Sequence, residues 1–194
     1  GTEATTGKDY EWIEEHAEEC FEEKFSNDFA YERLSDGEKI WYRDINTMLA
    51  YHYDGALKLS QEGLDKGLDE DNIEKIYNSV MMDHPEYFFV DGYEYTIYTR
   101  SEETVGIEIN VKYTYDTEEC LERQEEIRKV AEDIIYFAPD DGDDYDKIKY
   151  VYETVIYNTD YDMDAEDNQN IYSVFVGNTS VCQGYAKATQ YLLN

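Results

Sequence analysis

The chain has 194 residues, of which 41% are apolar, so it can fold around one or two hydrophobic cores. Its 47 acidic side chains against 16 lysines and arginines give a net charge of −31, which repels phosphate backbones and anionic lipid. We therefore expect no nucleic-acid partner, and the absence of a long uncharged apolar run predicts no membrane span. The three cysteines form no CxxC pair, so the sequence also predicts no zinc site built on cysteines.

Helices are expected through the first part of the chain. A glutamate-rich helix is predicted over residues 10–25. Ser35 and Glu38 then fit a capping box, and another helix over residues 69–82 ends before His84-Pro85, because the residue before proline avoids the helical region. Apolar residues at helical spacing predict the inward faces of the second and third helices. These residues are Trp41, Ile45, Met48, Leu49 and His52, followed by Ile73, Ile76, Tyr77 and Val80.

Strands are expected next. Residues 88–90 read as a strand that enters a two-residue hairpin turn at Asp91-Gly92. Alternation resumes from Tyr93 to Thr99 and is longest over residues 105–115, where six apolar positions share one face. This pattern predicts a half-buried antiparallel strand. The first part of the chain is therefore expected to be an α+β domain with a small antiparallel meander.

The rest of the chain reads as mostly helical. Asp116 and Glu119 give a helix-start signal, and the helix behind them is followed by a break at residues 138–144, the predicted domain boundary. Another amphipathic helix, a polar loop over residues 158–170, a short apolar segment and a last helix complete the chain. The predicted domains are residues 8–137 and 144–194. The expected inward residues are Ile127, Val130, Ala131, Ile134 and Ile135 in the first helix, and Ile148, Val151, Tyr152, Val155 and Ile156 in the second.

Cys182 stands where the last helix is predicted to begin. A helix N-terminus presents free N–H groups and a partial positive charge, which favour a thiolate over a thiol. Because the thiolate is the nucleophilic form, this position suits a catalytic cysteine. Cys20 and Cys120 are flanked by glutamates, which raise a thiol pKa, so they are interpreted as structural.

Residues 147–153, 158–162, 168–175 and 180–186 together resemble the bacterial transglutaminase-like family, of the secreted or lipoprotein type found in Firmicutes. The V-C-x-G-Y-A nucleophile motif of that family is matched by Val181, Cys182, Gln183, Gly184, Tyr185 and Ala186. Residues 83–86 and 88–93 are similar to an N-terminal extension found in some members. The resemblance implies the helical first part of a papain-like core and a location outside the cell or on its surface, including anchoring as a lipoprotein.

A Cys-His-Asp triad is the catalytic machinery that the resemblance implies, with both partners following the cysteine in sequence. No residue follows Asn194, so this chain is expected to be truncated after the nucleophile motif and inactive by itself. Cys182 is the expected nucleophile and its backbone N–H an oxyanion donor. Gln169 or Tyr172 is a candidate second donor, and Gln183 a further substrate-side candidate. The three histidines, His16, His52 and His84, are interpreted as structural or surface residues.

Two functions remain open from the sequence. The first is a fragment of a thiol enzyme that acts on protein amide bonds through a cysteine thioester, as a peptidase or an acyl transferase, with a protein or peptide as substrate. The alternative is a non-catalytic cell-surface binding or adaptor module of the same fold. No cofactor and no metal are expected, because the acidic runs at residues 140–146 and 160–164 do not fit a calcium-loop pattern. Self-association is a further expectation, through a C-terminal helix that exposes Leu192 and Leu193.

Overall fold

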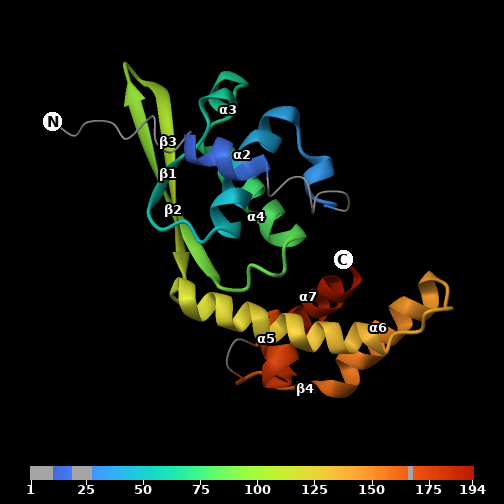
Figure 1. Cartoon of the computed structure of the whole chain (residues 1–194). Helices are drawn as coiled ribbons and strands as arrows, with labels where there is room; N and C mark the ends of the chain where they lie inside the picture. Colours follow the sequence, from blue (N-terminus) through green and yellow to red (C-terminus); the bar gives the residue numbers. More distant parts are fainter. Residues whose placement is uncertain (1–10, 19–27, 166–167) are drawn as a thin grey trace. The chain divides into compact units, whose positions relative to one another are not determined.

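The computed structural model describes residues 11–18, 28–165 and 168–194 and has the predicted α+β class. The chain divides into two compact units, each with its own core (Figure 1). The first contains the chain up to Asp83 together with Val90–Thr114, and the second contains His84–Phe89 and Tyr115–Asn194. Of the first predicted helix, residues 11–18 are helical, and its continuation with Cys20 lies outside the described residues.

The first unit contains both helices and strands. They are η2 (Tyr31–Arg33), α2 (Asp36–Ala50), β1 (Ala56–Lys58), α3 (Gln61–Asp65), η3 (Glu70–Asn72), α4 (Ile73–Asp83), β2 (Val90–Arg100) and β3 (Glu103–Tyr113). The second unit consists of α5 (Thr117–Tyr136), α6 (Asp144–Asn158), β4 (Asp160–Tyr161), the π-helical turn η4 (Ser173–Gly177), β5 (Thr179–Ser180) and α7 (Cys182–Leu193).

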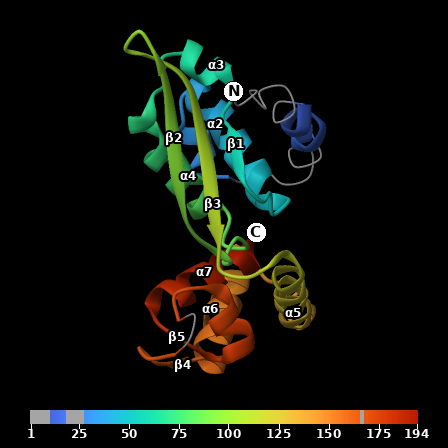
Figure 2. The same cartoon turned by 90° about the vertical axis from the view of Figure 1, so that its left-hand side faces the viewer.

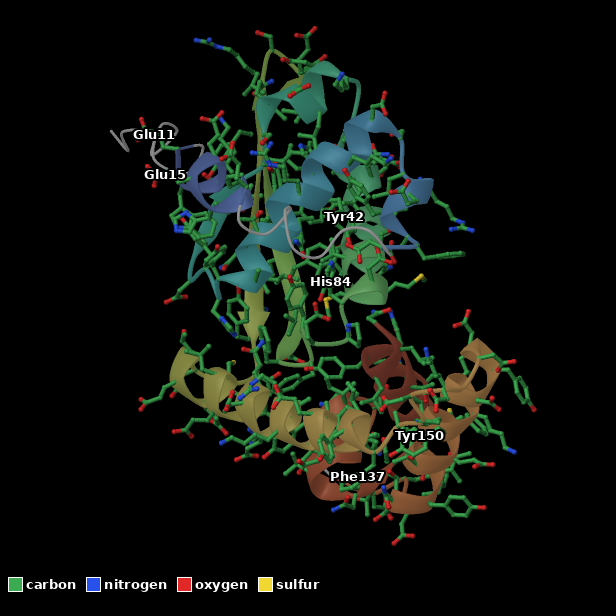
Figure 3. All side chains as sticks on the ribbon, turned by 45° about the vertical axis from the view of Figure 1, so that its right-hand side comes forward. Glu11, Glu15, Tyr42, His84, Phe137 and Tyr150 are labelled. Carbon is green, nitrogen blue, oxygen red and sulfur yellow. The ribbon has the colours of Figure 1, made fainter. Side chains whose placement is uncertain are left out.

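A three-stranded antiparallel sheet forms one layer of the first unit, and helices α2 and α4 form the other (Figures 1 and 2). The strand order is β1-β3-β2, so β3 is central. Ile107, Ile109 and Val111 of β3 are buried, as their alternation predicts. Trp41 and Tyr42 of α2 are fully buried, and Figure 3 shows Tyr42 inside the unit while Glu11 and Glu15 extend into solvent.

The capping box at the start of α2 is confirmed. The Ser35 hydroxyl accepts the Glu38 N–H at 3.3 Å, and the Glu38 carboxylate accepts the Ser35 N–H at 2.8 Å. Both bonds satisfy N–H groups that would otherwise lack a partner at the helix start. The predicted start of α5 is confirmed in the same way, because the Asp116 carboxylate accepts the Glu119 N–H at 2.9 Å.

The predicted hairpin turn at Asp91-Gly92 is wrong. Both residues lie inside β2, where the pairing register with β3 shifts between Val90 and Gly92. Gly92 has φ of +151°, a conformation that a β-bulge uses and that side chains rarely adopt. The turn lies instead at Ser101 and Glu102, which have φ of +52° and +67°, as a two-residue primed hairpin turn requires.

The core of the second unit joins α5, α6, η4 and α7. Ile127 and Ala131 of α5 are buried in the same cluster as Val151 and Val155 of α6. The other buried members are Ile171, Val174, Phe175, Ala188 and Leu192. Because α5 packs into this cluster, it belongs to the second unit, and the division of the chain lies before α5 rather than at the predicted break over residues 138–144.

Several predicted inward residues of the second unit are exposed. Ile135 of α5 is 53% exposed, and Ile148, Tyr152 and Ile156 of α6 are between 43% and 57% exposed. Only Val151 and Val155 of α6 are buried. The predicted exposure of Leu192 is also wrong, because it belongs to the core cluster while Leu193 is exposed.

Candidate functional site

Cys182 is the first residue of α7, and its side chain is exposed. Helices α2, α5 and α6 are each preceded by a residue whose side chain accepts a backbone N–H of the first turn. These residues are Ser35, Asp116 and Asp143. The residue before α7 is Val181, which has extended backbone and makes no such bond. The N-terminal N–H groups of α7 are therefore not occupied by a capping side chain, and the thiol stands beside them.

Gly184 allows α7 to pack closely against the loop before it. A Cβ at this position would overlap the Ser180 hydroxyl and would lie 3.1 Å from the backbone oxygens of Asn168 and Asn170. The Ser180 hydroxyl is fully buried, donates to the Asn168 carbonyl at 2.6 Å and accepts from the Ser173 hydroxyl at 2.9 Å. The glycine of the motif thus has a packing role that fixes where α7 begins.

Tyr185 ties α7 to the end of α6. Its hydroxyl donates to the Thr159 carbonyl at 2.7 Å, and burial, with the nearby Asp160 charge, raises the pKa of that hydroxyl. Just after Thr159, β4 pairs in parallel with β5, with Asp160 opposite Thr179 and Tyr161 opposite Ser180. The Tyr185 hydrogen bond therefore holds α7 against the segment that follows α6, and the β4–β5 pairing holds the loop before Cys182 against the same segment (Figure 2).

A groove of about 640 Å³ adjoins Cys182 within the second unit. Its walls come from α6, from the short strand β4 and from α7, and they are mostly apolar. The lining residues are Tyr152, Val155, Ile156, Thr159, Asp160, Tyr161, Cys182, Tyr185, Ala186 and Thr189. Of the motif residues, Cys182, Tyr185 and Ala186 therefore share one groove, and its size lies in the range of small-ligand pockets.

The environment of Cys120 differs from that of Cys182. Cys120 is fully buried on α5, and its thiol donates to the Tyr115 carbonyl at 3.6 Å. Burial, and then the charges of Asp116 and Glu119, raise the pKa of the Cys120 thiol to about 11. The predicted rise in the pKa of the Cys120 thiol is confirmed, although burial contributes more to it than the neighbouring carboxylates do.

The candidate oxyanion residues lie in different settings. Gln169 is exposed in the turn before η4, and Gln183 is exposed on the first turn of α7. The Tyr172 hydroxyl donates to Glu126 at 2.8 Å, and its ring lies 4.4 Å from the Arg123 guanidinium carbon. None of the three lines the groove beside Cys182. The Cys182 backbone N–H remains the donor candidate nearest to the thiol.

The histidines show local contacts of other kinds. His84 is buried in the second unit, where its Nδ1 is 2.7 Å from the Glu86 carboxylate and its ring stacks on Tyr87 (Figure 3). In the first unit, His16 stacks on Trp12, and His52 is buried with a left-handed φ of +51°. Burial lowers the pKa of His52. No histidine is among the described residues that line the groove.

Sequence reasoning missed part of the groove. The sequence indicates a polar loop at Thr159, Asp160 and Tyr161, within one of the stretches that carry the resemblance. A two-residue parallel pairing leaves no alternation from which their place in the groove could be predicted. In the described ranges, no helix is long and apolar enough to cross a membrane, and no group of histidine, cysteine and carboxylate side chains could hold a metal ion. No protein-family model matches the chain, and no curated protein matches it either.

Proposed function

We propose that the second unit carries the nucleophile of a transglutaminase-like thiol enzyme that acts on protein amide bonds through Cys182. The observation that carries this proposal is an exposed thiol at the uncapped start of α7, at one end of an apolar groove. Support also comes from the motif: Gly184 and Tyr185 have packing and hydrogen-bonding roles, whereas Cys182 contributes to no core.

The chemistry is an acyl transfer. The Cys182 thiolate attacks the carbonyl carbon of an amide, the C–N bond breaks, and the leaving amine takes up a proton while a thioester forms. Water or a second amine then attacks the thioester and regenerates the thiol. The N–H groups at the start of α7 are suited to bind the negative oxygen that develops in both steps.

Proton transfer needs a further group, and none of the described residues that line the groove is a histidine. The resemblance assigns that task to a histidine that follows the nucleophile, and all three histidines of this chain precede Cys182. We therefore expect the thiol to react with an activated probe but not to turn over an unactivated amide in this chain alone.

The test measures acylation by mass spectrometry. A peptide p-nitrophenyl ester with an aromatic side chain is incubated with the folded chain, so that the thiolate attacks the ester carbonyl, p-nitrophenolate leaves and a thioester forms. The acylated cysteine is then identified by peptide mapping. Labelling is expected at Cys182 and not at buried Cys120, and Cys182→Ser should abolish it. Tyr152→Ser, which removes an exposed groove ring, should slow labelling by the peptide but not by iodoacetamide.

Two results would contradict the proposal. Equal labelling of Cys182 and Cys120 would remove the case for a special thiol. Steady turnover of an unactivated peptide amide by the chain alone would remove the case for a downstream histidine.

The second candidate function is a binding module without catalysis. The exposed apolar side chains of α6, Tyr152 and Ile156 among them, favour it, because such groups on a surface mark contact sites. A peptide ligand that binds the groove equally well before and after Cys182→Ala, with no amide chemistry, would favour this candidate over the enzyme.

A further inference from the structure

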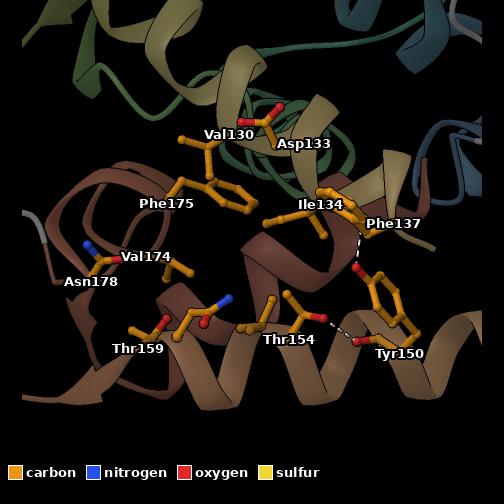
Figure 4. Close-up of a pocket in the computed structure, with 12 residues that line it drawn as sticks. Val130, Asp133, Ile134, Phe137, Tyr150, Thr154, Thr159, Val174, Phe175 and Asn178 are labelled. Carbon is orange, nitrogen blue, oxygen red and sulfur yellow. Dashed lines mark hydrogen bonds between the residues drawn. The ribbon is translucent and has the colours of Figure 1, made fainter.

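A second cavity lies in the second unit, apart from Cys182. It has a volume of about 390 Å³, is partly open to solvent, and is lined by the C-terminal half of α5, by α6 and by η4 (Figure 4). Its apolar walls include Val130 and Ile134 from α5, Phe137 just after α5, and Val174 and Phe175 from η4. This volume lies in the range that holds a small organic molecule, and the lining combines apolar walls with a few polar groups.

One of those polar groups is buried without a partner. Thr159 is 6% exposed, and its hydroxyl has no hydrogen-bond partner within the described part of the chain. A buried hydroxyl without a partner is unfavourable, so native proteins usually satisfy it with protein, water or ligand. Thr154, which also lines the cavity, differs because its hydroxyl donates to the Tyr150 carbonyl at 2.7 Å.

The wall beside Phe137 is fixed by a hydrogen bond between two helices. The Tyr150 hydroxyl of α6 donates to the Ile134 carbonyl of α5 at 2.9 Å, as the dashed line in Figure 4 shows. This bond holds the Tyr150 ring in the lining, and the rings of Phe137 and Phe175 also face the space. Aromatic faces of this kind attract organic cations as well as apolar groups.

The rim of the cavity carries an exposed negative charge. Asp133 lines the cavity, and over the described ranges no basic side chain forms an ion pair with it. The neighbouring Arg128 is already paired with Glu125 and Glu132. Together with the net charge of −31, this carboxylate favours a positively charged ligand over a neutral or negative one.

We propose that this cavity is a binding site for a small aryl-alkyl ammonium compound with a polar group at its far end. The ammonium pairs with Asp133, the ring occupies the apolar space between α5 and η4, and the polar group bonds the Thr159 hydroxyl. Figure 4 shows Asp133 and Thr159 on opposite sides of the cavity, which gives the ligand this order of groups. The proposal is independent of the thiol chemistry, because Cys182 does not line this cavity.

Three related probes test the order of groups by isothermal titration calorimetry on the full chain. Tyramine has the ammonium, the ring and a far hydroxyl; phenethylamine lacks the hydroxyl; and 4-hydroxyphenylpropionate replaces the cation by an anion. Binding should be strongest for tyramine, about fivefold weaker for phenethylamine and undetectable for the anion. Equal binding of tyramine and the anion would overturn the proposal, and so would no saturable binding of tyramine up to about 10 mM.

Matched variants separate binding from stability. Asp133→Asn should weaken tyramine binding about tenfold, whereas Asp141→Asn, an exposed carboxylate outside the lining, should not. Phe137→Ala should weaken it, whereas Tyr136→Ala, the more exposed neighbour, should not. Both aromatic side chains are largely exposed, so neither variant should unfold the chain.

Thr159→Val gives the sharpest readout. It removes the unpartnered hydroxyl and keeps the shape, so the melting temperature should stay the same or rise. The advantage of tyramine over phenethylamine should disappear in this variant. If the advantage persists at an unchanged melting temperature, Thr159 does not contact the ligand and the proposed order of groups is wrong. Cys182→Ala should leave all three affinities unchanged, which separates this site from the thiol.

Discussion

Helices α2 and α6 have the same length and a similar sequence pattern, but they differ in what they bury. Each has 15 residues with apolar side chains at helical spacing. In α2, Trp41, Ile45 and Met48 are fully buried within the first unit. In α6, only Val151 and Val155 are buried, and Tyr152 remains 57% exposed. The same periodicity therefore completes a core in one unit and supplies a surface in the other.

This difference shows where apolar side chains remain exposed instead of entering a core. The exposed α6 residues Tyr152 and Ile156 line the groove that contains Cys182, and Val155 lines both that groove and the cavity at η4. Apolar groups left in contact with water add little to folding, so the clustering of Tyr152 and Ile156 at the groove favours binding as their role. In the first unit, by contrast, the α2 face contributes chiefly to stability.

The largest effect expected from this comparison is the loss of Trp41. Trp41→Ala removes a fully buried ring whose indole N–H donates to the Ser60 carbonyl at 3.0 Å. It should lower the free energy of unfolding of the first unit by about 3 to 5 kcal/mol. Tyr152→Ala in α6 should change stability by about 0.5 kcal/mol or less, because the ring is largely exposed. Urea titrations of both variants measure the difference, and similar losses would contradict the contrast between the helices.

The next largest effect concerns a buried carboxylate in α2. Asp44 accepts the Ser60 N–H at 2.7 Å and the Ser60 hydroxyl at 2.9 Å. Burial raises the pKa of Asp44 from its ordinary value of 3.8 to about 6, although the bonds from Ser60 act in the opposite direction. Because the folded-state pKa is above the unfolded one, the stabilising contribution is complete below about pH 3.8. It is lost as the pH rises through about 6.

Asp44→Asn should remove this dependence. The free energy of unfolding of the variant relative to the parent should increase by up to about 3 kcal/mol between pH 4 and pH 7. Exposed Asp54→Asn, which removes the same charge, provides the control and should show a nearly flat difference. A flat difference for Asp44→Asn as well would mean that burial does not perturb this carboxylate.

Local signals in the sequence predicted what depends on neighbours along the chain. The α+β class, the caps at Ser35 and Asp116 and the alternation of β3 follow from residues a few positions apart. The Asp91-Gly92 prediction failed because glycine at positive φ serves a bulge as readily as a turn. The split face of α6 could not be predicted, because periodicity reports that a face is apolar but not what covers it.

The candidate site was predictable in part for the same reason. Cys182 at a helix start, with Gly184 and Tyr185 after it, is a local pattern, and the structure places the thiol at the first residue of α7. The unpartnered hydroxyl of Thr159 and its place at two hollows depend on packing between α6, η4 and α7, for which a single threonine in a polar loop gives no signal.

A smaller effect is expected at Gly184. Gly184→Ala places a Cβ on the Ser180 hydroxyl and 3.1 Å from two backbone oxygens, so α7 must shift. We expect a loss of about 1 to 3 kcal/mol, together with slower labelling of Cys182. Gly177→Ala is the matched control, because its Cβ meets only the Thr179 hydroxyl at 3.8 Å. Ser180→Ala combined with Gly184→Ala should restore part of the loss, and a strictly additive double variant would argue against this contact.

The smallest effect tests whether the uncapped start of α7 serves reactivity rather than stability. Val181→Ser supplies a side chain that can accept an N–H of the first turn, as Ser35 does for α2. Stability should rise by about 0.5 to 1 kcal/mol, and Ser35→Ala should lose about as much from the first unit. If the free N–H groups of α7 bind the oxyanion, Val181→Ser should also slow acylation of Cys182 by the peptide p-nitrophenyl ester, since the new hydroxyl competes for the same donors. A stabilised variant with unchanged acylation would show that these N–H groups do not take part, and would leave the α7 start as an ordinary helix end.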